Sequence, residues 1–371
     1  MESETEEEVN MMSGADDLRA ARESRASAAD RANRPGRGDS ITRMVNAAVY
    51  RATHRPAPSA PPAPPRRSTV EDKPKPLGPD FRSAMHTANA RIDVLGLSEL
   101  RTPDGTIRYL DIGEGTPVLL VHGMFGGTDA ALRQLRPLVP GGFRLIVPSR
   151  FGYLGSSLPA GATPARQADA FADLLDHLGI ARAAVLAVSA GATSALHMAT
   201  RHRCRVSALV LLSPNAPGSH QDRQEMPRVV ARTLLGSDRL MWLLRHRFPA
   251  RLTRLMGVPE DRPLGAADRA RVDAELDGLF PVARRAAGVL FDAYVSNPAV
   301  NDCDLRRVIA PTLIVHARDD ALMPCWGAVA LSETILGSRL LVLENGGGHL
   351  MLGEHPEITP AVQALLRSIR D

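Results

Sequence analysis

The sequence has little of several residue types that often mark a protein class. Three of its 371 residues are cysteine, at Cys204, Cys303 and Cys325, with neither pairing nor metal-ligand spacing. An odd number of scattered cysteines predicts free thiols in a reducing compartment, and excludes a disulfide framework or a structural zinc site. Lysine occurs only at Lys73 and Lys75, so arginine supplies nearly all of the positive charge. Because arginine is so common here, a single arginine does not indicate an anion site.

Long apolar runs and concentrated charge are also missing. No run of 18 apolar residues occurs, so we expect no transmembrane helix. The acidic stretch from Glu2 to Glu8 is not followed by an apolar segment, so we expect no secretory signal and a cytoplasmic location. The net charge is only +4, and no basic block contains interleaved aromatic residues, which argues against nucleic-acid binding. We expect no metal site and no cofactor.

Composition divides the chain into an N-terminal extension and a globular part. Residues 1–80 balance 13 acidic against 13 basic residues and include a proline-rich stretch over 56–79. Such a segment buries too little apolar surface to offset the entropy of ordering, so we expect it to be disordered. Residues 41–51 have the spacing of a short amphipathic helix. A scaffold role, with the proline-rich stretch binding partner domains, is one hypothesis for this extension.

The globular part alternates apolar strand patterns with helical patterns from residue 117 onward. This alternation predicts a mostly parallel sheet with helices on both of its faces. The expected strands are 97–101, 106–111, 117–121, 143–147, 183–188, 206–212, 311–316 and 339–343. The expected core helices are 129–136, 163–178, 193–199 and 356–369, with one more between the last two strands.

The alternation stops between residues 217 and 300, where only helical patterns occur. These expected helices are 228–235, 239–247, 250–256, 266–279 and 282–294. The sequence therefore predicts an α/β core in two parts, 81–216 and 301–371. A helical cap, 217–300, is inserted after the strand that follows the helix at 193–199.

The stretch 183–192 carries the strongest functional signal. An apolar run ends in Ala187-Val188-Ser189-Ala190-Gly191 and continues as a helix, and a serine at such a turn is typical of a nucleophile elbow. Small residues at Ala187 and Gly191 let strand and helix approach closely, so that the Ser189 hydroxyl projects from the sheet. The amide of Ala190 lies at a helix N-terminus, where it can bind an oxyanion. The first position of the G-x-S-x-G pattern is Ala187 here, and its methyl group is still small.

Three further loops follow predicted strands and carry the other groups that such a serine requires. A serine hydroxyl is a poor nucleophile until an imidazole takes its proton, and a carboxylate must fix the imidazole tautomer. The loop at 345–349 ends in His349 after three glycines, which allow it to fold back toward Ser189. The loop at 317–324 contains two neighbouring acids, Asp319 and Asp320, and the loop at 122–127 begins His122-Gly123.

These four segments, in this order, resemble the α/β-hydrolase family over about residues 95–370, in its capped branch with a His-Gly oxyanion loop. The resemblance implies an α/β-hydrolase fold with a catalytic triad. Ser189 would be the nucleophile, Asp320 the acid and His349 the base. Asp320 stands four residues before Pro324, which is the family's usual spacing. Asp319 remains the alternative acid, and would otherwise cap the turn.

The same resemblance assigns the oxyanion hole. The backbone amides of Met124 and Ala190 would be its two donors, while His122 and Gly123 shape the loop through their backbone. Four other histidines and one cysteine near these segments are expected to be structural, solvated or inert. They are His197, His202, His316, His355 and Cys325.

The identity of the nucleophile narrows the reaction. Epoxide hydrolases and haloalkane dehalogenases of this family use a carboxylate, so Ser189 argues against both. Carbon–carbon bond hydrolases usually have Asn before the serine and Trp after the base, where this chain has Val188 and Leu350. Haloperoxidase-like members usually have an aromatic residue where this chain has Met124. We therefore expect a carboxylic-ester hydrolase.

Alternatives stay open within and outside this enzyme class. A thioesterase, a carbon–carbon bond hydrolase or a haloperoxidase-like enzyme would use the same fold, and a catalytically silent ligand-binding protein would be the alternative from another class. The cap segment 239–248 combines leucines and Trp242 with arginines and contains no acid. It either packs an apolar face on the core or roofs an acyl pocket and contacts lipid surfaces. We expect a small, apolar acyl substrate.

Overall fold

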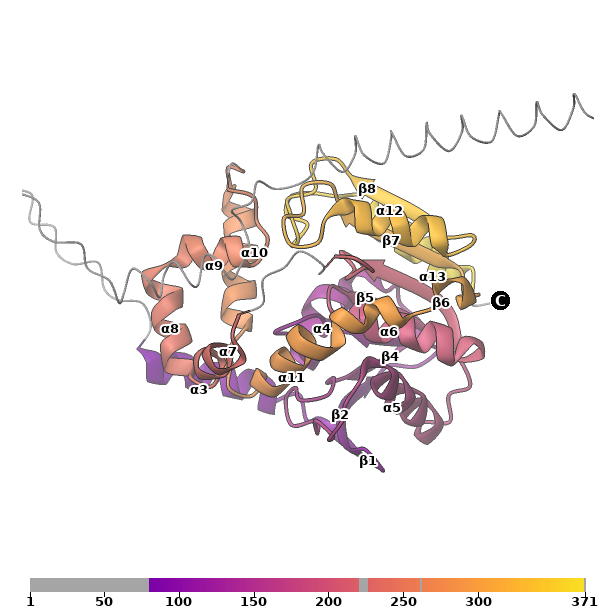
Figure 1. Cartoon of the computed structure of the whole chain (residues 1–371), viewed down its shortest axis with the longest axis horizontal. Coiled ribbons are helices and arrows are strands. Elements are labelled where there is room, and N and C mark those ends of the chain that lie inside the picture. The colour runs from indigo at the N-terminus through magenta and orange to yellow at the C-terminus, as the bar shows by residue number, and fades with distance from the viewer. Residues whose placement is uncertain (1–79, 220–225, 261, 370–371) are drawn as a thin grey trace, which may run out of the picture.

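The computed structural model describes residues 80–219, 226–260 and 262–369, and these residues form one eight-stranded sheet (Figure 1). Along the sheet the strands run in the order β1-β2-β4-β3-β5-β6-β7-β8. Their bounds are β1 Ser98–Thr102, β2 Gly105–Ile112, β3 Thr116–Val121, β4 Phe143–Pro148, β5 Ala183–Val188, β6 Val206–Leu212, β7 Thr312–Ala317 and β8 Arg339–Leu343. Strands β1 and β2 form an antiparallel hairpin, and β2 pairs antiparallel with β4, whereas all later pairs are parallel. The predicted, mostly parallel sheet is confirmed.

The strand β5 lies in the middle of the sheet because both of its faces are apolar. Val185 and Ala187 belong to the hydrophobic core on one face, while Ala184 and Leu186 belong to the core on the other. A strand covered on both faces needs such a continuous apolar run, since successive side chains point to opposite sides. The end of β5, where Ser189 follows, is thereby held in a fixed position.

Helices cover both faces of the sheet, as predicted. One apolar core joins the sheet to helices α5 (Pro164–His177), α6 (Gly191–Arg201) and α12 (Cys325–Thr334). The other joins it to α4 (Thr128–Leu135) and α13 (Ile358–Arg367). The predicted helices match these elements within a few residues at each end.

The inserted segment between β6 and β7 is helical and lies to one side of the sheet (Figure 1). Its helices are α7 (Arg228–Leu235), α8 (Asp238–Arg247), α9 (Pro249–Leu255), α10 (Ala266–Gly278) and α11 (Ala286–Phe291). We predicted one helix over 282–294, but α11 begins at Ala286 and widens at Asp292 into a π-helical turn, Asp292–Ser296. The turn carries the buried Asp292, whose carboxylate binds an arginine of the core.

A helix before the sheet, α3 (Phe81–Asp93), was not predicted. It packs on the cap: the Phe81 and Trp242 rings meet edge to face with their centroids 5.8 Å apart, and Arg91 donates to the Phe280 carbonyl. The predicted domain division had placed these residues with the first part of the core. The predictions for residues 1–79 lie outside the described residues. Within the described ranges, no helix is both long and apolar enough to cross a membrane.

Candidate active site

Ser189 occupies a strained turn between β5 and α6. Its φ is 54°, in the left-handed region that residues with a Cβ rarely adopt. The Ser189 amide donates to the Leu212 carbonyl of the neighbouring strand at 2.9 Å, which fixes the turn to the sheet. A Cβ on Gly191 would lie 2.5 Å from the His122 carbonyl oxygen, so only glycine allows α6 to begin this close to β3. The close approach expected from the small residues of the turn is therefore present.

The structure brings Ser189, His349 and Asp320 into one chain of hydrogen bonds. The Ser189 Oγ lies 2.8 Å from His349 Nε2, and His349 Nδ1 lies 2.7 Å from Asp320 Oδ2. With the Nδ1 proton donated to the carboxylate, Nε2 is left to accept from the serine hydroxyl. The three groups come from loops that follow three different strands, 160 and 29 residues apart along the chain.

The Asp320 side chain is buried and ionised. Burial alone would raise the pKa of this carboxyl, but the charge and hydrogen bond of His349, the charge of His316 and the Met323 amide lower it below its ordinary value. Its Oδ1 accepts from the amides of Leu322 and Met323 at 2.8 and 2.9 Å. The acid loop thus folds around this carboxylate and aims its second oxygen at the imidazole.

The neighbouring acid, Asp319, has a different position. Its two carboxylate oxygens accept from the amides of Gly347 and Gly348, both at 3.1 Å. Asp319 therefore holds the backbone of the loop that presents His349, while Asp320 contacts the imidazole itself.

The loop after β3 lies directly against the serine. A Cβ on Gly123 would lie 3.1 Å from the Ser189 Cβ, so the Gly123 backbone passes Ser189 closely, and Met124 follows it in the chain. On the other side, Ala190 is the N-cap residue of α6, whose first amides lack partners within the helix. The two amides expected to bind an oxyanion thus belong to backbone segments that flank Ser189.

His122 shapes this loop as a neutral side chain. Its Nε2 accepts from the Arg150 amide at 3.0 Å, so its Nδ1 carries the proton and donates to the Gly123 carbonyl at 2.8 Å. Complete burial, with a contribution from the Arg150 charge, holds the pKa of His122 well below its ordinary value. The imidazole is therefore part of the loop's scaffold.

Two buried arginine–aspartate pairs brace the same loop, and the sequence did not reveal them. Arg150 binds both oxygens of Asp292, at 2.6 and 2.5 Å, and also donates from Nε to the His122 carbonyl at 2.9 Å. Arg285 binds both oxygens of Asp129, at 3.1 and 2.8 Å, and also donates to the Gly126 carbonyl. The segment 285–292, which contains the last cap helix α11, therefore holds the loop at both ends.

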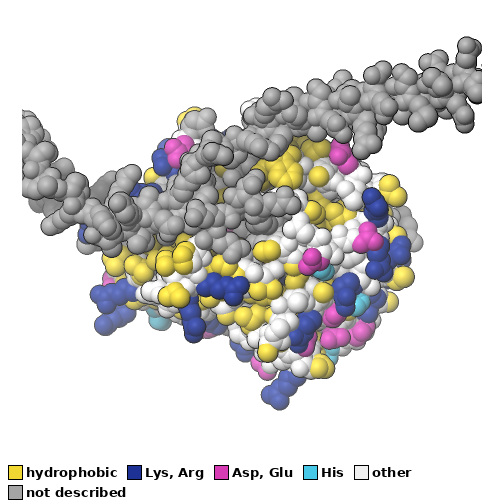
Figure 2. All heavy atoms as spheres, viewed as in Figure 1, with side chains coloured by type: hydrophobic (Ala, Val, Ile, Leu, Met, Phe, Trp, Pro, Cys, Tyr) yellow, Lys and Arg dark blue, Asp and Glu magenta, His cyan; other side chains and the backbone are white. Residues whose placement is uncertain are grey.

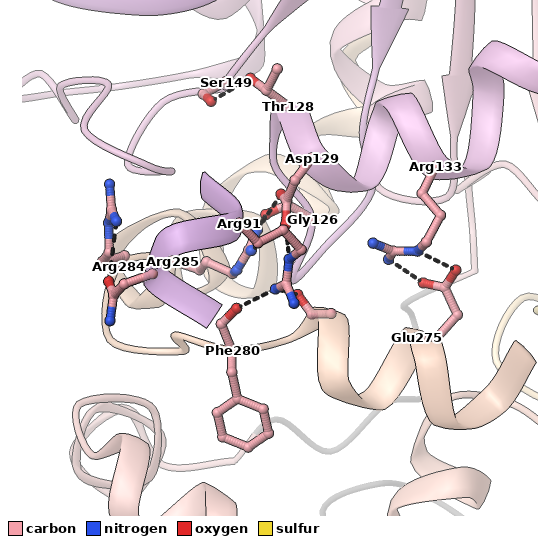
Figure 3. A network of polar contacts seen from close by, with 12 residues as sticks. Arg91, Gly126, Thr128, Asp129, Arg133, Ser149, Glu275, Phe280, Arg284 and Arg285 are labelled. Atoms are coloured by element: carbon pink, nitrogen blue, oxygen red, sulfur yellow. Dashed lines mark hydrogen bonds and ion pairs between the residues drawn. The ribbon is translucent and has the colours of Figure 1, made fainter. Parts of the chain in front are cut away.

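Figure 3 shows the second pair and its surroundings. Arg91 of α3 and Arg285 are both directed at Asp129, and Arg133 of α4 separately binds Glu275 of α10. Burial would raise the pKa of Asp129, but these cations, Arg285 first among them, lower it below the ordinary value. Arginine is frequent in this chain, so the sequence does not distinguish these buried, paired arginines from solvated ones. Only their contacts in the structure do.

We expect Asp129→Asn to lower the free energy of unfolding by about 3–5 kcal/mol, because it leaves the Arg285 guanidinium buried without its carboxylate. Asp111→Asn is the matched control. Asp111 also forms a bidentate pair, with Arg144, but about a quarter of its side chain is exposed. That variant should lose about 0–1 kcal/mol. Urea denaturation of both variants measures the difference, and equal losses would contradict a buried, essential pair.

The four histidines that the sequence analysis expected to be structural or solvated bond to backbone carbonyls or to a surface carboxylate. Their partners are Ala299 for His197, Asp169 for His202, Met323 for His316, and Gly346 and Leu352 for His355. Burial raises the pKa of the Cys325 thiol. A groove of about 370 Å³ lies between α5, α6 and residues 295–307, and Ser189, His349 and Asp320 are not among its lining residues. Within the described ranges, no cluster of three side chains could ligate a metal.

The sequence of this chain is similar to those of known hydrolases. An uncharacterized hydrolase of Bacillus subtilis, YcgS, is 28% identical over 70% of this chain and 93% of its own length. The 2-hydroxymuconate semialdehyde hydrolase of Pseudomonas putida is 28% identical over 67% of this chain and 85% of its own length.

A solved alpha/beta hydrolase fold protein from Nakamurella multipartita is 30% identical, with a TM-score of 0.60, over 74% of this chain and 99% of its own. The model of the alpha/beta hydrolase family matches residues 118–359, a range that runs from the loop before Ser189 to the loop of His349. With its sheet, its elbow and this match, the chain belongs to the alpha/beta hydrolase family.

Proposed function

We propose that this hydrolase cleaves a carboxylic ester through an acyl-enzyme on Ser189. The observation that carries the proposal is the hydrogen-bonded chain from the Ser189 hydroxyl through His349 to the buried Asp320 carboxylate. The strained backbone of Ser189 is a second support, because strain of this kind is retained where it presents a reactive group.

In the proposed reaction, Ser189 Oγ attacks the ester carbonyl carbon while His349 Nε2 takes the hydroxyl proton. The carbonyl oxygen becomes an oxyanion between the amides of Met124 and Ala190, and each such donor contributes about 2.7–4 kcal/mol. The C–O bond to the alcohol then breaks, and the imidazolium gives its proton to the leaving oxygen. A water molecule, deprotonated by His349, releases the acid in the same way, and Asp320 stabilises the imidazolium in both halves.

Carbon–carbon bond hydrolysis is the second candidate, because relatives such as the Pseudomonas putida enzyme are named hydrolases of 2-hydroxymuconate semialdehyde. Two positions favour the ester reaction over it. Val188 stands before the nucleophile and Leu350 after the base, where carbon–carbon bond hydrolases of this fold usually have Asn and Trp.

A substrate panel separates the two reactions. The full chain is assayed with nitrophenyl esters of graded acyl length and with 2-hydroxymuconate semialdehyde, and Ser189→Ala serves as the blank in each assay. Faster turnover of the esters than of 2-hydroxymuconate semialdehyde supports ester hydrolysis. Turnover of 2-hydroxymuconate semialdehyde alone would show that carbon–carbon bond hydrolysis is the reaction.

We further propose that the substrate is an apolar acyl compound and that the cap contacts anionic lipid surfaces. Residues 228–255, which form α7, α8 and α9, contain seven arginines and one acid, Asp238, whereas the whole chain carries a net charge of +4. Among these arginines, Val229, Leu243 and Phe248 are 77%, 44% and 45% exposed. At the side where Figure 1 places the cap, Figure 2 shows hydrophobic side chains with some basic ones beside them. Mixed basic and apolar surfaces of this kind bind anionic membranes.

The full chain should therefore sediment with vesicles that contain phosphatidylserine, more than with phosphatidylcholine vesicles. Arg239→Glu combined with Arg247→Glu should weaken this binding, since both side chains are exposed on α8. Arg136→Glu combined with Arg182→Glu changes the charge equally at exposed core positions and should have a smaller effect. Equal binding to both lipids, or equal loss in both double variants, would contradict a lipid-binding cap.

A further inference from the structure

The backbone of His349 is bonded to the cap on one side and to the core on the other. Its amide donates to the Gly257 carbonyl at 3.1 Å, in the loop that follows α9. Its carbonyl accepts from the Ser213 hydroxyl at 3.3 Å, just beyond β6. The position of the imidazole therefore depends on a cap residue that does not touch the reacting atoms.

Gly257 packs against His349 as closely as a backbone can. Its φ is +76°, in the left-handed region, and a Cβ at this position would lie 2.5 Å from the His349 Cβ and 2.7 Å from Leu322 Cγ. Any side chain here would have to displace either the loop of the base or the loop of the acid. Only glycine lets the cap lie directly on these two loops.

Further hydrogen bonds from the cap hold both ends of the His349 loop. The Asp268 carboxylate accepts from the Gly353 amide at 2.8 Å. Arg262 donates to the Leu352 carbonyl at 3.1 Å and to the Asn345 carbonyl at 3.3 Å. The cap thus binds this loop before, at and after the histidine.

From the core side, Asp319 binds the loop through the amides of Gly347 and Gly348. The loop is therefore held between a core carboxylate and a cap backbone, and neither contact alone fixes where His349 stands. Proton transfer requires a hydrogen bond of about 2.6–3.2 Å between nucleophile and base. A misplacement of about 1 Å costs up to about 10²-fold in rate.

We propose that Gly257 and Asp268 of the cap are positioning residues that set His349 against Ser189. The cap would then act in the chemical step as well as in covering the substrate. The proposal rests on the proposed serine-hydrolase function of the site. If it is right, the kcat of the enzyme depends on how the Gly257 loop packs against the His349 loop, although Gly257 itself bonds to neither the Ser189 hydroxyl nor the Asp320 carboxylate.

The first test is Gly257→Ala, assayed with the nitrophenyl ester that the full chain hydrolyses fastest. We expect kcat and the rate of fluorophosphonate labelling to fall by about tenfold or more, with KM changed by less than about threefold. Gly265→Ala is the matched control, because Gly265 lies in the same part of the cap with φ −68° and no atom within 4 Å of the added Cβ. It should retain both rates. Equal rates in the two variants, or a raised KM with kcat unchanged in Gly257→Ala, would overturn the proposal.

The second test does not depend on a glycine position. Asp268→Ala removes the acceptor for the Gly353 amide and should lower kcat, whereas Asp268→Asn keeps an acceptor oxygen and should restore most of it. The thermal midpoints of both variants show whether a lower kcat is caused by lower stability of the fold. A kcat that falls equally in both variants would refute positioning through this hydrogen bond. Full turnover by Ser189→Ala would refute the proposed function itself, and that result is independent of either cap variant.

Discussion

Replacing Ser189 with alanine is expected to lower ester turnover by about six orders of magnitude, as loss of the nucleophile does when triad members act as a unit. His349→Ala should cost nearly as much, because it removes the imidazole to which the hydroxyl is hydrogen-bonded. The double variant should be scarcely slower than either single one. The residual rate would come from the oxyanion hole and substrate binding.

The measurement combines turnover with labelling. A fluorophosphonate should form one P–O bond to Ser189 with loss of fluoride, and mass spectrometry should find the adduct on the peptide that contains this residue. Ser194→Ala is the matched control, since Ser194 is buried in α6, the helix that follows Ser189, and its hydroxyl has no hydrogen-bond partner among the described residues. It should label and turn over normally. An adduct on another serine would refute the mechanism.

Local patterns in the sequence predicted the parts of the fold that depend on local periodicity. The apolar run of β5 and the amphipathic pattern of α5 each depend on which faces of that one element are buried. The alternation of such strands and helices then predicted a mostly parallel sheet. The elbow could be predicted for the same reason, because its small residues are required within five positions of Ser189. The loops that carry Asp320 and His349 were located by their place after a strand.

Features that depend on distant pairing could not be predicted. The helix α3 was missed because its residues bury little surface of their own, and its contacts with Trp242 and Phe280 lie far along the chain. The pair Arg285–Asp129 joins residues 156 positions apart. No single-sequence pattern distinguishes these from the many solvated arginines and aspartates of this chain.

The docked cap loop was missed for a related reason. Gly257 ends an ordinary helix, and a glycine at such a place commonly serves only to terminate it. Its contact with His349 gives it a further role, which becomes visible only when the two loops are placed together. Together with the segment 285–292, this loop makes the cap a support for both sides of the candidate site.

Asp320→Asn is expected to reduce turnover by up to about four orders of magnitude while leaving the fold intact, as loss of the carboxylate does in serine proteases. The Asn side chain would still fill the buried site and its oxygen could accept from the Leu322 and Met323 amides. Its amide nitrogen, however, would favour the imidazole tautomer with the proton on Nε2, which cannot accept from Ser189. No charge would then stabilise the imidazolium.

Asp319→Asn separates this chemical role from loop support. Asp319 bonds only to the amides of Gly347 and Gly348 among the described residues, and Asn keeps one acceptor oxygen, so we expect a loss of less than about tenfold. Turnover of the two variants at neutral pH decides between them, because the lowered pKa of Asp320 keeps the wild-type carboxylate ionised there. If Asp319→Asn proved the more damaging change, the acid would be assigned to the wrong member of the pair, and the bond between Asp320 and His349 would serve only to hold the loop.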